Sequence, residues 1–142
     1  MSKAGPERPS HAGLRHLALK VRDMAAMRRF YVDLLGFAIE WEPDADNLYL
    51  SSGVDNLALH RSADVPPADR AAGAVDSALD HLGVIVRTPE DVDRWAAFLE
   101  SEGVTLRARP RTHRDGARSC YVLDPDGNSV QVIHHPPISS KI

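Results

Sequence analysis

The chain has 142 residues, of which 43% are hydrophobic and 26% charged, and its formal net charge is −3. These values are typical of one globular domain with a real core, and the acidic balance disfavours a general nucleic-acid binder. No apolar stretch approaches the roughly 20 residues that span a bilayer. A single cysteine, Cys120, excludes an intrachain disulfide and favours a cytoplasmic protein.

The first half of the chain predicts a strand, a helix and three more strands. Residues 1–12 are polar, without the hydrophobic segment of a secretory signal, and predict a flexible leader. Apolar alternation predicts a strand over 14–21, and Asp23 can cap a helix that ends at Gly36. Three further strands are expected over 37–42, 48–51 and 56–61. A β-α-β-β-β module over 13–61 follows.

The second half predicts the same order of elements. Residues 62–78 are rich in Ala, Pro, Asp and Gly and predict a linker. The module that follows, 79–135, begins with a strand, and Thr88-Pro89-Glu90-Asp91 is a strong helix start. The remaining expected elements are strands over 104–108, 120–123 and 129–134, an arginine-rich loop over 107–118, and a tail over 136–142.

A histidine stands near the start of the first strand in each module. The segment Arg15-His16-Leu17-Ala18-Leu19 is echoed 65 positions later by Asp80-His81-Leu82-Gly83-Val84. Because the repeat places two imidazoles at equivalent points, modules paired about a pseudo-twofold axis would turn both toward one cavity. The repeat therefore predicts a metal site built from two half-sites.

Several motifs resemble the vicinal-oxygen-chelate superfamily, which includes glyoxalase I, fosfomycin-resistance thiol transferases, extradiol dioxygenases and bleomycin-resistance proteins. The resemblance rests on His16-Leu17-Ala18-Leu19 with Asp23, on Phe30-Tyr31-Val32-Asp33-Leu34-Leu35-Gly36-Phe37, on Asp80-His81-Leu82, and on Tyr121-Val122-Leu123-Asp124-Pro125-Asp126-Gly127-Asn128. It implies an α+β fold in which two βαβββ modules form an open, cup-shaped, eight-stranded mixed sheet around one divalent metal.

The resemblance also implies a set of metal ligands. His16, His81 and Gln131 are the expected ligands of an Fe, Mn, Ni, Co or Zn ion. Gln131 stands where these enzymes commonly have glutamate, so it either ligates weakly through its amide oxygen or lines a metal-free cup. The position equivalent to Gln131 in the first module is Ala58. His60, two residues further, is a fourth ligand; otherwise it lines the pocket as a substrate-binding residue or reaches the surface.

Other residues are candidates for substrate contact. Tyr121 and Gln131 are the candidate catalytic residues, although packing is an alternative role for Tyr121. Arg114 and Arg118 are the candidate substrate-binding residues of the arginine-rich loop, because guanidinium groups suit carboxylate or phosphonate oxygens. The alternative is that this loop is simply solvated.

Two functions are compatible with these residues. The first is a metal-dependent enzyme, of the glyoxalase or dioxygenase type, whose small anionic substrate chelates the metal through two oxygens. The second is a metal-free protein that sequesters a small molecule, as bleomycin-resistance proteins do. For either function we expect a homodimer that has a small-molecule ligand and binds neither nucleic acid nor membrane.

Overall fold

The computed structural model describes residues 8–9, 11–65 and 79–142. Most of the predicted leader (1–12) and of the predicted linker (62–78) lies outside these residues. No described helix has the length and apolar composition to cross a membrane.

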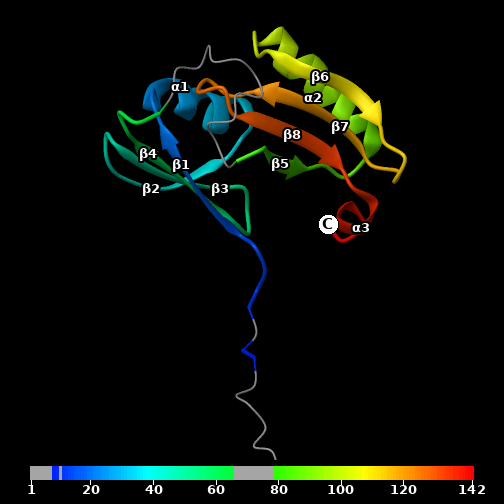
Figure 1. Ribbon diagram of the computed structural model, residues 1–142, viewed down its shortest axis with the longest axis horizontal. Coiled ribbons are helices and arrows are strands. Elements are labelled where there is room, and N and C mark those ends of the chain that lie inside the picture. Colours follow the sequence, from blue (N-terminus) through cyan, green and yellow to red (C-terminus); the bar gives the residue numbers. More distant parts are fainter. Residues whose placement is uncertain (1–7, 10, 66–78) are drawn as a thin grey trace, which may run out of the picture.

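The described chain contains two modules with the same order of elements (Figure 1). The first comprises β1 (His16–Val21), α1 (Met24–Arg28), the π-helical segment η1 (Arg29–Leu34), β2 (Ala38–Asp44), β3 (Asn47–Ser51) and β4 (Asn56–Arg61). The second comprises β5 (Leu82–Ile85), α2 (Pro89–Ser101), β6 (Leu106–Thr112), β7 (Arg118–Leu123) and β8 (Ser129–His134), followed by α3 (Pro136–Ser139).

The α+β class and the two βαβββ modules are confirmed. The eight strands form two four-stranded mixed sheets, ordered β1-β4-β3-β2 and β5-β8-β7-β6, rather than one continuous ladder. In each sheet the first strand of the module runs parallel to the last strand, and the other pairs are antiparallel. The two candidate histidine segments therefore lie at sheet edges, where the two modules can face each other.

Local signals explain where the helices begin and end. The Asp23 side chain accepts a hydrogen bond from the Ala26 N–H at 3.0 Å, and Thr88 forms a reciprocal capping box with Asp91. Gly36 adopts a φ of 80° after the first helix, a conformation that favours glycine. These predicted caps are confirmed.

Three predicted elements differ from the structure. The first helix changes after Arg28 into the π-helical segment η1, which ends at Leu34. The stretch 107–112 is the greater part of strand β6, so the predicted arginine-rich loop over 107–118 is wrong in its first half; pairing with β7 extends the strand although its burial pattern is mostly exposed. A short helix, α3, occupies part of the predicted tail.

A buried polar contact joins the two modules. The Tyr31 hydroxyl on η1 donates a 2.9 Å hydrogen bond to Oδ2 of Asp124 in the β7–β8 turn, and both residues are buried. In the same turn, Asp126 Oδ2 accepts the Arg22 backbone N–H at 2.8 Å. One apolar cluster runs across this joint, from Leu19 and Met27 in the first module to Val130 in the second. The helical segment of the first module is therefore packed against both halves.

Removal of the Tyr31 hydroxyl tests this joint. A Tyr31→Phe variant should lower the free energy of unfolding by about 1.5–3 kcal/mol, because the buried Asp124 carboxylate loses one of its donors. Urea denaturation is the measurement. Tyr49→Phe is the matched control, since the Tyr49 hydroxyl makes no hydrogen bond to another described residue. Equal stability of the two variants would contradict a cross-module hydrogen bond.

The stability of this joint should also depend on pH. Burial raises the pKa of the Asp124 carboxyl above its ordinary value of 3.8, so the folded chain binds this proton more tightly than the unfolded chain. The contribution of Asp124 to the free energy of unfolding should therefore fall as pH rises from about 4 toward neutrality. Urea denaturation from pH 4 to 7 should show wild type losing stability relative to Asp124→Asn; parallel profiles would contradict this prediction.

Candidate functional site

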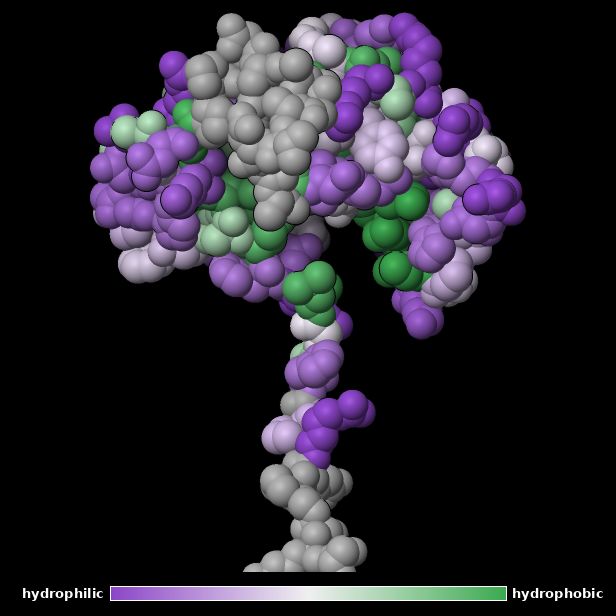
Figure 2. All heavy atoms as spheres, viewed as in Figure 1, coloured by the Kyte–Doolittle hydropathy of each residue, from purple (hydrophilic) through white to green (hydrophobic). Residues whose placement is uncertain are grey.

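A cavity of about 580 Å³ lies between the two modules. In Figure 2 the molecule is hollowed between its two halves, and apolar side chains line the wall of the second half. The polar side chains that line the cavity include both repeat histidines and the predicted third ligand: His16, His81, Gln131, Asn56, His135, Arg15 and Asp55. Residues that are 115 positions apart in sequence thus line one space.

His16 is held at one end of a chain of hydrogen bonds. Its Nδ1 lies 2.8 Å from Oδ1 of Asn56, its register partner on β4. The amide nitrogen of Asn56 donates to Glu40 Oε2 at 2.8 Å, which leaves the amide oxygen to face His16 as an acceptor. The His16 Nδ1 must then carry the proton. Its Nε2 keeps a free lone pair, as a metal-binding imidazole requires.

His81 has the same arrangement with a different partner. Its Nδ1 lies 2.6 Å from Oδ1 of Asp80, a carboxylate that can only accept while ionised. The ring of His81 also meets the ring of Tyr121 edge to face, with centroids 5.3 Å apart. These two contacts orient the imidazole and leave its Nε2 as the free nitrogen.

Gln131 and Tyr121 form a pair on neighbouring strands. They are register partners on β8 and β7, and Gln131 Nε2 donates a 2.9 Å hydrogen bond to the Tyr121 hydroxyl. With its nitrogen engaged, the Gln131 side chain has its Oε1 available as an oxygen donor. Tyr121 therefore contacts both His81 and Gln131, which makes it a positioning residue for two cavity-lining side chains.

The donor set fits a divalent metal, but a weakly held one. Two imidazole nitrogens and one neutral amide oxygen are ligands that Fe, Mn or Zn accept. Among the described residues, no three His, Cys, Asp or Glu side chains are close enough to hold an ion, so the third protein donor would be Gln131. Because these three ligands include no carboxylate, they provide no negative charge to balance the positive charge of the metal.

The predicted substrate-binding residues lie elsewhere. Arg118 forms a double hydrogen bond with Asp93 of α2, with distances of 2.9 and 2.6 Å, and Arg114 stands in the β6–β7 turn beside a separate hollow. His60 lies on β4, where its Nδ1 is 2.6 Å from Asn47 Oδ1. None of the three is among the residues that line the cavity.

Two cavity residues were not singled out as substrate-binding residues from the sequence. Arg15 directly precedes His16, and that adjacency was a signal that could have identified it. His135 shares strand parity with Gln131, a spacing that places both on one face of β8 and its extension. Cys120 faces away from this chemistry: it is fully buried, and burial raises the pKa of its thiol.

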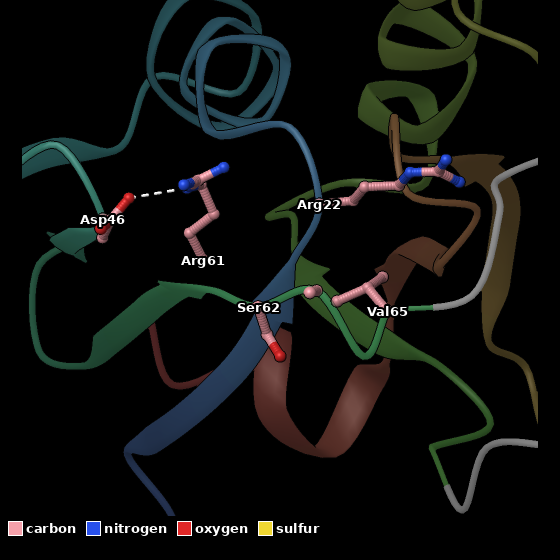
Figure 3. A pocket seen from close by; sticks show the side chains of 6 residues that line it. Arg22, Asp46, Arg61, Ser62 and Val65 are labelled. Atoms are coloured by element: carbon pink, nitrogen blue, oxygen red, sulfur yellow. Dashed lines mark hydrogen bonds and ion pairs between the residues drawn. The ribbon is translucent and has the colours of Figure 1, made fainter.

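A second cavity, of about 500 Å³, lies near the end of β4 and does not form an anion site (Figure 3). Arg22 and Arg61 both line it, yet their side chains point away from each other. Arg61 is already paired with Asp46 at 2.7 Å. Without converging guanidinium groups, this cavity has no clear chemistry.

Comparison with known proteins adds family context to this geometry. The sequence profile of the Glyoxalase/Bleomycin resistance protein/Dioxygenase superfamily matches residues 13–132. A 2,2',3-trihydroxybiphenyl dioxygenase of Sphingomonas paucimobilis is 30% identical over 133 residues, which are 90% of this chain and 43% of that protein. The chain thus spans less than half the length of this dioxygenase.

Two further proteins are similar to this chain over most of its length. The metallothiol transferase FosB of Staphylococcus epidermidis is 27% identical over 121 residues, 84% of this chain and 81% of that protein. The crystal structure of a lactoylglutathione lyase from Agrobacterium tumefaciens superposes with a TM-score of 0.71 at 22% identity, covering 89% of this chain and 96% of that one. This last similarity supports the fold.

The hydrogen bonds of His16 predict its tautomer. Long-range ¹H–¹⁵N NMR on neutral histidines should show His16 and His81 protonated at Nδ1, because each Nδ1 faces an acceptor. Asn56→Ala should remove this preference at His16 and leave His81 unchanged. Protonation at Nε2 in the wild-type chain would contradict the proposed availability of that nitrogen.

Proposed function

The chain belongs to the Glyoxalase/Bleomycin resistance protein/Dioxygenase superfamily, and we propose that it is a metal-dependent enzyme of this group. His16, His81 and Gln131 would hold a divalent ion, and the substrate would be a small oxygenated anion. The observation that carries the proposal is that one cavity is lined by two histidines whose Nδ1 atoms are both engaged, which leaves both Nε2 atoms free.

A bound metal would act as a Lewis acid that polarises two adjacent substrate oxygens. The chain's own residues would orient the substrate and handle its charge. Arg15 is the cationic side chain of the cavity lining and would attract the anionic part of the substrate. The apolar wall, which includes Leu57, Ile85 and Ile133, would exclude water from the rest of the substrate.

Gln131 restricts the proton chemistry that is available. An amide does not shuttle a proton, whereas the glutamate common in related enzymes does. The Tyr121 hydroxyl accepts a hydrogen bond from Gln131, so its own proton points elsewhere and is free for donation. We therefore propose Tyr121 as the proton donor beside Gln131.

A metal-free binding protein is the second candidate, and the cavity lining favours it. Most of the lining side chains are apolar, and such a surface suits a ligand held by burial alone. The amide in place of a carboxylate agrees with this reading as well. The expected homodimer, the identity of the metal and the substrate stay predictions under both candidates.

Metal stoichiometry distinguishes the two candidates. Elemental analysis of untagged protein should find about one Fe, Mn, Ni, Co or Zn per chain, and a His16→Ala/His81→Ala double variant should lose it. His11→Ala/His113→Ala is the matched control, because it removes two histidines outside the cavity. Absence of metal in the wild type after reconstitution would overturn the metalloenzyme proposal and support the binding protein.

A second measurement tests the role of Gln131 as the weak ligand. Gln131→Glu restores a carboxylate and should tighten metal binding by roughly tenfold or more, since an added negative charge beside a divalent cation is strongly favourable. Competition with a chromophoric chelator measures this change. An unchanged affinity would show that residue 131 does not touch the metal.

A further inference from the structure

The short helix α3 forms one end of the cavity between the modules. Four residues line the cavity at this end: Ile85, Ile133, His135 and Ile138. Gln131 and Ile133 are alternate residues of β8, and the extended His135 continues the alternation, so the strand rise places His135 about 13 Å from Gln131. In Figure 1, α3 lies directly beyond the carboxyl end of β8. The cavity therefore extends along β8 from the candidate metal ligands to α3.

A buried serine fastens α3 to the strands beside it. Ser139 is 5% exposed, and its hydroxyl donates a 2.8 Å hydrogen bond to the carbonyl oxygen of Val86, directly after the end of β5. The same hydroxyl oxygen accepts the backbone N–H of His135, directly after the end of β8, at 3.0 Å. Because a buried hydroxyl needs its partners in fixed directions, Ser139 determines where α3 lies relative to both strands.

Two prolines make this segment stiff. Pro136 and Pro137 open α3, and a proline at the first helical position already has the φ angle that the helix needs. The Pro136 ring also lies beside Gly116 in the β6–β7 turn. The helix is therefore held against β5, β8 and the β6–β7 turn, although it has only four residues.

The end of the cavity beside α3 is apolar and partly open. Ile138 precedes the anchored Ser139 and is 46% exposed although it lines the cavity, and Ile85 of β5 is 36% exposed. None of the four residues that line this end carries a carboxylate, an ammonium or a guanidinium group. An apolar group of a ligand would remove the surface of both isoleucines from water, which is favourable.

From this geometry we propose that α3 limits the length of the ligand that the cavity accepts. Ile138 is the specificity-determining residue, because a ligand that runs along β8 past Ile133 meets its side chain. Ser139 is a positioning residue, because it acts through the location of α3 and is not itself part of the cavity lining. The inference rests on the proposed function and deepens it: the substrate carries its metal-binding oxygens at one end and an apolar group at the other.

Straight-chain alkanoates from butanoate to decanoate test the length limit. Titrations are followed through the isoleucine methyl signals of ¹³C-labelled protein in the presence of a metal chelator, and Ile138→Val assigns the Ile138 signal. Affinity should rise about fourfold for each methylene that becomes buried, and the rise should stop at the chain length that reaches α3. The Ile138 methyl signal should begin to shift at that length.

Replacement of Ile138 tests the specificity-determining residue. Ile138→Ala removes the side chain that ends the cavity, so affinity should keep rising about fourfold per methylene beyond the limit of the wild-type chain. Ile142→Ala is the matched control, because Ile142 is also exposed but is not part of the cavity lining. This control should leave the length limit unchanged.

Replacement of Ser139 tests the positioning residue. Ser139→Ala removes both hydrogen bonds of the hydroxyl, so the backbone amide of Ile138 should exchange faster with solvent. The length limit should also move in the direction expected for Ile138→Ala. Ser140→Ala is the matched control, since Ser140 is exposed and should change neither measurement. A role in stability alone would lower the free energy of unfolding without moving the length limit.

Four outcomes would overturn the proposal. They are absence of alkanoate binding, binding that does not shift the Ile138 methyl signal, equal length limits for the two isoleucine variants, and equal length limits for the two serine variants. Because the titrations are free of metal, failure here leaves the metal-stoichiometry test intact, and the reverse also holds.

Discussion

The buried hydrogen bond between Tyr31 and Asp124 is the contact on which the rest of the arrangement depends. Asp124 also accepts the N–H groups of Asp126 and Asn128, so one carboxylate shapes its own turn and binds the other module. Apolar packing alone has little directional preference, whereas a buried carboxylate must have its donors in fixed directions. This contact therefore joins η1 of the first module to the β7–β8 turn of the second, beside the apolar cluster that both modules share.

Polar partners of the two cavity histidines determine which ring nitrogen of each histidine is free. Glu40 orients Asn56, Asn56 orients His16, and Asp80 orients His81. Across β2, β3 and β4, Asp44, Asn47 and His60 form the same kind of chain. In each case an acceptor holds Nδ1 and leaves Nε2 free. The two modules thus orient their histidine rings in the same way, although the residues that do so differ between the modules.

Charged side chains of the second module form ion pairs with each other rather than one cationic cluster. In the sequence alone, the arginines of 107–118 are close enough together to suggest an anion-binding loop. In the structure, Arg109 pairs with Glu100 and Arg118 with Asp93, so both bind the helix α2 that covers their sheet (Figure 1). Among the residues that line the cavity, Arg15 is the arginine. Substrate selection by charge at the cavity would depend on this residue.

The sequence by itself determined the class, the order of elements and the equivalence of His16 with His81, because apolar periodicity, capping residues and an internal repeat are local signals. It could not show that β6 extends to Thr112, since strand pairing rather than propensity decides that end. Nor could it identify Asn56, Glu40 or the Trp41–Tyr49 stack, which depend on register between strands. Only the tertiary structure decided which side chains share a cavity or a face, because those contacts join residues that no local pattern connects.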